Sequence, residues 1–230
     1  VLRSIGCEVI ELDCNLDYNF PKYNPNPEDL KMLHALSDCV KKNQADIGFA
    51  FDGDGDRLIA VDEKGEKIDG DKIIALFAKN YLDKKQLNKK TVVTTVMSNL
   101  GLEKYLKNIL GLKLIRADVG DINVILEMKK NSYNLGGEQS GHIILGNFMN
   151  TGDGILAALK ILEIMFFLKQ KSSKLFDIYE QYPQKQINLP FKNKLNNVLK
   201  NKLRRVVKSN EINNPNLRFV VRESGTEPLI

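Results

Sequence analysis

Short apolar runs alternate with longer helical patterns along most of this chain, and this alternation restricts the fold more than any other feature of the sequence. The runs are rich in β-branched residues and bounded by polar turns, which predicts strands. The segments between them carry apolar residues three and four positions apart, which predicts amphipathic helices. Alternating strands and helices are typical of α/β layering with largely parallel strands. We therefore predict an α/β fold.

The expected elements follow from the same patterns. Strands are predicted at 8–12, 47–51, 58–61, 91–96, 113–116 and 142–145. Helices are predicted at 28–41, 71–82, 101–110, 122–130 and 154–169.

The pattern changes after Tyr182. A strand at 184–189, a basic amphipathic helix, a turn rich in Asn and Pro and a strand at 217–221 predict a smaller α+β domain there. A second boundary is expected in the polar stretch at 88–90. The predicted domains are 1–88, 89–182 and 183–230.

Composition excludes several classes of protein. The net charge of +5 could indicate an anionic partner, but the densest basic region, 192–208, spaces its charges as on the solvated face of a helix, so we expect no nucleic acid partner. No apolar run reaches the roughly 18 to 20 residues that span a bilayer, so we expect no membrane partner. Three cysteines without a CxxC pair fit a reducing cytoplasm.

The segment FAFDGDGDRLIAVD carries the strongest chemical signal. An apolar strand ends in Asp52, Asp54 and Asp56, with a glycine after each of the first two. Glycine permits a tight turn, so the three carboxylates can converge on one hard cation. Arg57 follows and offers a planar, permanently charged donor suited to a phosphoryl oxygen. The pattern predicts magnesium beside a phosphate.

Other interpretations fit parts of this loop. A calcium hand would need glycine where Arg57 stands, and helices rather than strands on either side. A phosphatase of the haloacid dehalogenase type would use Asp52 as nucleophile and Asp54 as acid. An acidic turn without a ligand would have to compensate the repulsion among its carboxylates. A cation-binding domain without enzymatic activity is a further alternative.

The segment LGGEQSGHIIL places a polar stretch between two apolar runs. Glu138 and Ser140 stand two residues apart, so on an extended backbone they point the same way and can bind neighbouring sugar hydroxyls. His142 shares that parity and can move a proton near neutral pH, although a lone histidine is more often structural.

The segment FVVRESGTEPLI has the composition of a phosphate cradle. Arg222 offers a fork of donors, Ser224 and Thr226 offer hydroxyls, and Gly225 lets backbone N–H groups approach an anion. A surface turn is the alternative for this segment alone. The three loops in one chain together predict a phosphosugar site.

In this order, DGDGDR, GEQSGH and RESGTEP resemble the metal-binding, sugar-binding and phosphate-binding loops of the α-D-phosphohexomutase superfamily. The stretches MSNLGL, RADVGD and NTGDGILAAL resemble its bacterial phosphoglucosamine mutase branch, and the phosphomannomutase branch usually has Met where Gln139 stands. The resemblance covers nearly the whole chain. It implies repeated three-layer α/β domains with mixed, largely parallel sheets, followed by a smaller α+β C-terminal domain.

The resemblance also implies a cytoplasmic isomerase of carbohydrate metabolism, on the route to UDP-N-acetylglucosamine. It would interconvert glucosamine 6-phosphate and glucosamine 1-phosphate through a 1,6-bisphosphate, with phosphomannomutase or phosphoglucomutase activity as the alternative. The implied site residues are Asp52, Asp54 and Asp56 for Mg²⁺, Arg57 at the transferring phosphoryl, His142 as proton shuttle, Glu138 and Ser140 at sugar hydroxyls, and Arg222, Ser224, Gly225 and Thr226 at the non-reacting phosphate.

The family's phosphoserine lies in an upstream domain within a motif like TASHNP, which this sequence lacks. We therefore expect a fragment at both ends that is inactive by itself. The family commonly has a basic residue and then Tyr after the VGD triplet, whereas Ile122 and Asn123 follow here. That difference weakens the expectation that this helix start binds phosphate.

Overall fold

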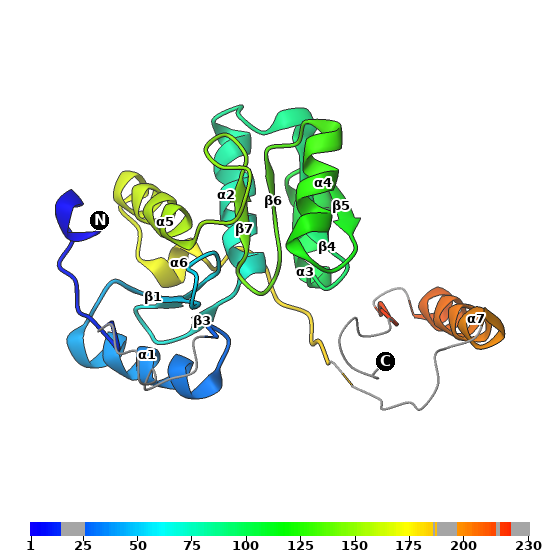
Figure 1. Cartoon of the computed structure of the whole chain (residues 1–230), viewed down its shortest axis with the longest axis horizontal. Helices are drawn as coiled ribbons and strands as arrows, with labels where there is room; N and C mark the ends of the chain where they lie inside the picture. Colours follow the sequence, from blue (N-terminus) through cyan, green and yellow to red (C-terminus); the bar gives the residue numbers. More distant parts are fainter. Residues whose placement is uncertain (15–25, 186, 188–196, 215–216, 222–230) are drawn as a thin grey trace. The chain divides into compact units, whose positions relative to one another are not determined.

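The chain divides into two compact units, Val1–Gln181 and Tyr182–Ile230. Figure 1 shows the computed structural model. The first unit holds two sheets and their covering helices, which confirms the α/β class. The structure describes residues 1–14, 26–185, 187, 197–214 and 217–221.

Local capping signals start several of the helices. Asp29, Asp69 and Asp153 each accept backbone hydrogen bonds from the first turn of the helix that follows them. Such caps satisfy N–H groups that have no partner inside the helix, and so fix where the helix begins. The helical segments of the first unit are η1 (Arg3–Ile5), α1 (Leu30–Asn43), α2 (Gly70–Asp83), η2 (Asn88–Lys90), α3 (Leu100–Lys104), the π-helical turn η3 (Tyr105–Ile109), α4 (Asp121–Asn131), α5 (Gly154–Leu168) and α6 (Ser172–Leu175).

The first sheet has the order β1–β2–β3. β1 (Ile47–Phe51) pairs with β2 (Leu58–Asp62), which pairs with β3 (Lys67–Ile68), and both pairings are antiparallel. Short turns join these strands, whereas a parallel connection needs a crossover of a dozen or more residues. The expectation of largely parallel strands is therefore wrong for the described strands of this sheet, and β3 was not predicted.

This sheet is the middle layer of three. Successive residues of β2 alternate between two cores: Leu58 and Ala60 face one, and Ile59 and Val61 face the other. The second core lies against α1, and the first is shared with α2 and α5. In Figure 1, α1 lies on one side of β1 and β3, and α5 and α6 lie on the other.

The second sheet has the order β5–β4–β6–β7 and is mixed, largely parallel, as predicted. β4 (Thr91–Thr95) lies between β5 (Lys113–Ala117) and β6 (Leu135–Gly137), parallel to both, while β7 (Ile143–Leu145) is antiparallel to β6. The carboxyl ends of the three parallel strands therefore meet at one edge. Ligands of open α/β sheets bind at such an edge.

The helix α2 packs on the second sheet although it precedes β4 in the chain. It contacts β6 and β7 and buries Ile73, Ile74 and Phe77 completely or nearly so. Val92 of β4 belongs to this core, whereas Val93 packs with α4 on the opposite face. Because the α2 core also includes residues of β2 and α5, the two sheets share one continuous interior.

Three predicted strands are wrong wherever the structure describes them. Residues 8–12 and 217–221 are not in strands, nor are the described residues 184, 185 and 187. An apolar run becomes a strand only when a second backbone takes up its N–H and C=O groups, and no described residue pairs with these segments.

The second unit shows one helix in its described part, α7 (Asn197–Asn213), and none of its residues is buried. The phosphate-loop residues Arg222, Ser224, Gly225 and Thr226 lie outside the described residues. Within the described part of the chain, no helix has the length and apolar character needed to cross a bilayer.

Candidate functional site

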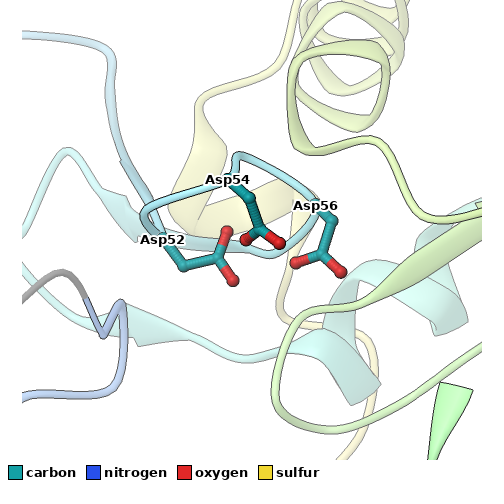
Figure 2. A group of neighbouring side chains, drawn as sticks. All are labelled: Asp52, Asp54 and Asp56. Atoms are coloured by element: carbon teal, nitrogen blue, oxygen red, sulfur yellow. The ribbon is translucent and has the colours of Figure 1, made fainter.

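The three aspartates of the first loop converge. Asp52, Asp54 and Asp56 each offer a carboxylate oxygen, and these oxygens lie within 4.8 Å of one another. Figure 2 shows the three side chains on the turn that joins β1 to β2, with Asp54 between the other two. Gly55 has a φ of +76°, a left-handed conformation that glycine adopts without strain. The sequence prediction that these carboxylates meet is therefore supported by the geometry.

Arg57 closes the loop on Asp52. Its Nε lies 2.6 Å from Asp52 Oδ2, and its backbone N–H donates to Asp52 Oδ1 at 3.1 Å. Burial raises the pKa of Asp52, but these hydrogen bonds outweigh it and hold the pKa below 3.8. The Asp52 side chain is only 4% exposed, so its negative charge is stabilised by Arg57 rather than by water.

Asp56 has the opposite electrostatic environment. Burial, followed by the nearby carboxylate of Asp52, raises the pKa of Asp56 above 3.8. The loop thus carries more negative charge than Arg57 compensates. Closely spaced carboxylate oxygens with an uncompensated charge are the donor set of a hard divalent cation, so these residues fit Mg²⁺.

The second loop lies directly beside the first. Arg57 and His142 form an antiparallel β-bridge, and the N–H of Leu58 donates to the carbonyl of Gly141 at 3.0 Å. A Cβ on Gly141 would lie 2.3 Å from the carbonyl oxygen of Leu58, so this approach requires glycine. The two loops that the sequence suggested for metal and sugar are therefore parts of one site.

The second loop is a turn, not an extended strand. The N–H of Gly141 donates to the carbonyl of Glu138 at 3.0 Å, and Gly141 has a φ of +99°. The parity argument that aligned Glu138 with Ser140 and His142 is therefore wrong, because it assumed an extended backbone. Glu138 and Ser140 are half-buried, whereas the side chain of His142 is only 3% exposed.

Glu138 reaches a third segment, the turn at the carboxyl end of β5. Its Oε1 accepts a hydrogen bond of 3.1 Å from the N–H of Gly120. Gly120 has a φ of +117°, which favours glycine, and Asp121 next to it begins α4. Asp121 Oδ2 lies 4.0 Å from His142 Nε2. In the sequence, the RADVGD stretch was noted only for its resemblance to the family. Its Gly120 and Asp121 are the residues that could have indicated a place in the site.

A fourth segment contacts each of the two loops through one glycine. The N–H of Gly154, the first residue of α5, donates to the carbonyl of Gly55 at 2.9 Å. A Cβ on Gly152 would lie 2.5 to 2.7 Å from three atoms of the His142 ring. These residues were not predicted to belong to the site, although the two glycines of NTGDG permit a close backbone approach.

The loop after β4, which contains the MSNLGL stretch, is held by hydrogen bonds from buried and half-buried side chains. Asp71 of α2 accepts a hydrogen bond from the N–H of Asn99 at 2.6 Å. Arg116 of β5 donates to the carbonyls of Thr95 and Ser98, and also pairs with Glu103 at 2.9 Å. These contacts fix the loop at the same sheet edge as Gly120 and Glu138.

Comparison with known proteins identifies the family. Residues 69–184 match phosphoglucomutase/phosphomannomutase, alpha/beta/alpha domain III, and residues 1–65 match alpha/beta/alpha domain II. The chain belongs to this family. A phosphoglucosamine mutase from Anoxybacillus flavithermus is 48% identical over 85% of this chain and 44% of its own length. One from Bartonella bacilliformis is 47% identical over 100% of this chain and 50% of its own length.

Solved structures agree. A phosphoglucomutase/phosphomannomutase family protein from Burkholderia thailandensis superposes with a TM-score of 0.70 at 28% identity, over 82% of this chain and 40% of that one. The family assignment confirms the predicted resemblance to the α-D-phosphohexomutases. The chain spans about half the length of the relatives it matches.

Proposed function

We propose that this chain is the metal-binding and sugar-binding part of a phosphoglucosamine mutase, which interconverts glucosamine 6-phosphate and glucosamine 1-phosphate. The observation that carries the proposal is the junction of two loops: the Arg57–His142 bridge joins the loop of the three aspartates to the loop that carries Glu138. A phosphoryl group and a sugar hydroxyl must meet in this reaction, and the junction holds donors suited to each.

The roles of the residues follow from their chemistry. Asp52, Asp54 and Asp56 hold Mg²⁺, which when bound neutralises charge on the phosphoryl oxygens. Arg57 is held by Asp52 through its Nε, and its guanidinium stays charged at any working pH. The guanidinium orients the transferring phosphoryl, and Glu138 and Ser140 accept and donate hydrogen bonds at sugar hydroxyls.

The phosphate of the substrate that does not react requires a second binding site. We assign it to Arg222, Ser224, Gly225 and Thr226, whose composition suits a phosphate cradle. The reaction then runs as two transfers: a phosphoserine in another part of the protein gives its phosphoryl to the sugar, and the resulting 1,6-bisphosphate returns its other phosphoryl to the serine. Positioning and charge neutralisation are the main requirements of such transfers.

The glucosamine preference has two supports. The relatives of highest identity named above are phosphoglucosamine mutases, and Gln139 stands where the phosphomannomutase branch usually has Met. Phosphomannomutase or phosphoglucomutase activity is the alternative. The proposal includes a cytoplasmic setting, because Cys7, Cys14 and Cys39 are all free thiols, which fits a reducing compartment.

The phosphatase alternative is disfavoured by Asp52 itself. A nucleophilic carboxylate needs an oxygen that can reach phosphorus. Both oxygens of Asp52 accept hydrogen bonds from Arg57, and this pairing lowers the pKa of Asp52 and with it the nucleophilicity of the carboxylate. Each oxygen keeps a second lone pair for a cation, so the pairing favours a ligand over a nucleophile.

The test is a mutase assay of the whole protein that contains this chain, primed with glucosamine 1,6-bisphosphate and Mg²⁺. Glucosamine, glucose and mannose 6-phosphates are compared in parallel. We expect the highest kcat/KM on glucosamine 6-phosphate and a loss of about 100-fold or more in Asp54→Ala. Asp38→Ala, which changes an exposed aspartate of α1, is the matched control.

Preference for mannose or glucose phosphate would reassign the chain to a neighbouring branch of the family. Phosphate release without isomerisation would support the phosphatase instead.

A further inference from the structure

His142 is buried beside the metal loop rather than exposed to solvent. Its side chain is 3% exposed, and both ring nitrogens are buried. A proton shuttle must reach the sugar hydroxyl directly or through one water. The Nε2 end of the ring instead lies close to the backbone of Gly152 and to the carboxylates of two aspartates.

The two carboxylates come from different loops. Nε2 of His142 lies 3.3 Å from Asp56 Oδ2 and 4.0 Å from Asp121 Oδ2. Neither ring nitrogen has a hydrogen-bond partner of good geometry in the described part of the chain. A buried N–H needs an acceptor, and Asp56 is the nearer of these two carboxylates. The Asp56 carboxylate, 3.3 Å from Nε2, is therefore the group that a small rotation of either side chain would pair with the ring.

The backbone of His142 is fixed independently of its ring. Its carbonyl accepts a hydrogen bond from the N–H of Glu138 at 2.9 Å, and it bridges Arg57. Gly152 lies so close to the Nε2 end of the ring that any Cβ there would overlap the imidazole. The Nε2 end of the ring is thus confined between Gly152 and the metal loop.

We infer that His142 is a positioning residue of the metal loop, whose imidazole fixes the carboxylate of Asp56 for cation binding. This inference rests on the proposed metal site and deepens it. Groups that orient a metal ligand from behind commonly change metal affinity as strongly as some of the ligands do. The imidazole of His142 acts on the substrate only through Asp56, and the proton-shuttle role is not needed.

Direct metal binding tests this inference without requiring turnover. Mn²⁺, a paramagnetic substitute for Mg²⁺, is titrated into the 230-residue chain and the free ion is followed by electron paramagnetic resonance. We expect His142→Ala to weaken Mn²⁺ binding by roughly 10-fold to 100-fold. His142→Gln can still present an N–H to Asp56 but cannot carry a proton, so it should recover most of the lost affinity. His34→Gln, at an exposed position of α1, is the matched control.

A second variant displaces the ring without removing it. Gly152→Ala places a methyl group against the imidazole, and we expect it to weaken Mn²⁺ binding as well. Combined with His142→Ala it should add little, because both changes break the same contact. Circular dichroism of each variant verifies that the fold is retained.

The outcomes separate the inference from the proposed function. Equal Mn²⁺ affinity in wild-type and His142→Ala chains would overturn the positioning role and leave the mutase proposal intact. A His142→Gln chain that binds Mn²⁺ as weakly as His142→Ala would also overturn it. A wild-type chain that binds no Mn²⁺ would contradict the metal assignment on which both depend.

Discussion

At the scale of single residues, carboxylates of this chain differ according to what surrounds them. Asp52 is paired with Arg57, which lowers its pKa, whereas burial and then the neighbouring Asp52 raise the pKa of Asp56. The charge of Glu63, directly after β2, is stabilised by hydrogen bonds from hydroxyls and an N–H rather than by a cation. It accepts hydrogen bonds from Ser172 Oγ and from the N–H of Ser173, each at 2.7 Å. This contact fastens α6 to the first sheet.

Glu63 yields a stability prediction with a defined pH dependence. Burial raises its pKa, but the hydrogen bonds from Ser173 and Ser172 outweigh burial and lower the pKa from 4.5 to about 2. A lowered carboxyl pKa stabilises the fold above pH 4.5, and that contribution is lost as the pH falls toward 2. Glu63→Gln should therefore lower the free energy of unfolding at pH 7 by about 1 kcal/mol, allowing for solvent screening.

Urea unfolding from pH 7 down to pH 3 measures this effect. The difference between wild type and Glu63→Gln should narrow as the pH falls. Glu66→Gln, at an exposed position of the same hairpin, is the control. If the difference in unfolding free energy between the two proteins were constant with pH, the contribution of Glu63 would come from packing and not from its charge.

The sequence predicted the residues of the metal loop but not all of their surroundings. Asp52, Asp54, Asp56 and Arg57 are near neighbours in the chain, so their convergence depends on one turn. The approach of His142 to Asp56 depends instead on how β6, β7 and the first sheet pack together. No local pattern encodes such a contact.

At the scale of elements, helices were predicted better than strands. Caps such as Asp69 and Asp153 and the spacing of apolar residues are local signals, and the helices that follow begin close to the predicted positions. The run at 8–12 has strand composition but forms none, because a strand requires a partner that its own sequence cannot specify. The fold class was therefore easier to predict than the pairing of the first sheet.

The helix α2 carries a buried acid that makes stability depend on pH. Asp71 is fully buried, and burial, followed by the neighbouring Asp69, raises its pKa from 3.8 to about 7. Between these two values the folded protein keeps a proton that the unfolded chain has released. The free energy of unfolding should therefore fall as the pH rises from 4 to 7, by on the order of a few kcal/mol.

Asp71→Asn should remove this part of the pH dependence, because an amide has no proton to release. Its oxygen can still accept the hydrogen bond from the N–H of Asn99. Relative to wild type, the variant should gain stability as the pH rises from 4 to 8, measured by urea unfolding. Asp83→Asn, at the exposed end of α2, should keep the wild-type slope. Parallel slopes for Asp71→Asn and wild type would contradict the assignment.

At the scale of the whole molecule, the two sheets and their helices form one unit with a continuous core. α2 packs on the second sheet, and the domain III match begins at residue 69. The domain boundary near residues 88–90 stays a prediction. The packing of α2 and the start of the match at residue 69 favour a boundary earlier in the chain. The residues of the described site all lie within Val1–Gln181, whereas the predicted phosphate loop lies in the second unit.

This division predicts that metal binding and phosphate binding can be separated by truncation. A chain ending after Gln181 keeps the amide that donates to Asp69 at 2.6 Å, and it keeps all four segments around Asp56. It should bind Mn²⁺ within about twofold of the 230-residue chain, because distant sites contribute nearly independently. Its affinity for glucosamine 6-phosphate should be much lower, since Arg222 is removed. Calorimetric titration measures both ligands.

A chain ending after Leu168 is the informative contrast. It lacks α6, and with it Ser172 and the buried Leu175 and Phe176 of the shared core. Removing buried side chains of this size costs about 2 to 5 kcal/mol each, which is comparable to the whole stability of a domain. We therefore expect it to lose cooperative unfolding, whereas the chain ending after Gln181 retains it. If truncation after Gln181 also abolished Mn²⁺ binding, the metal loop would depend on the second unit, and the two units could not be treated as separate parts of the site.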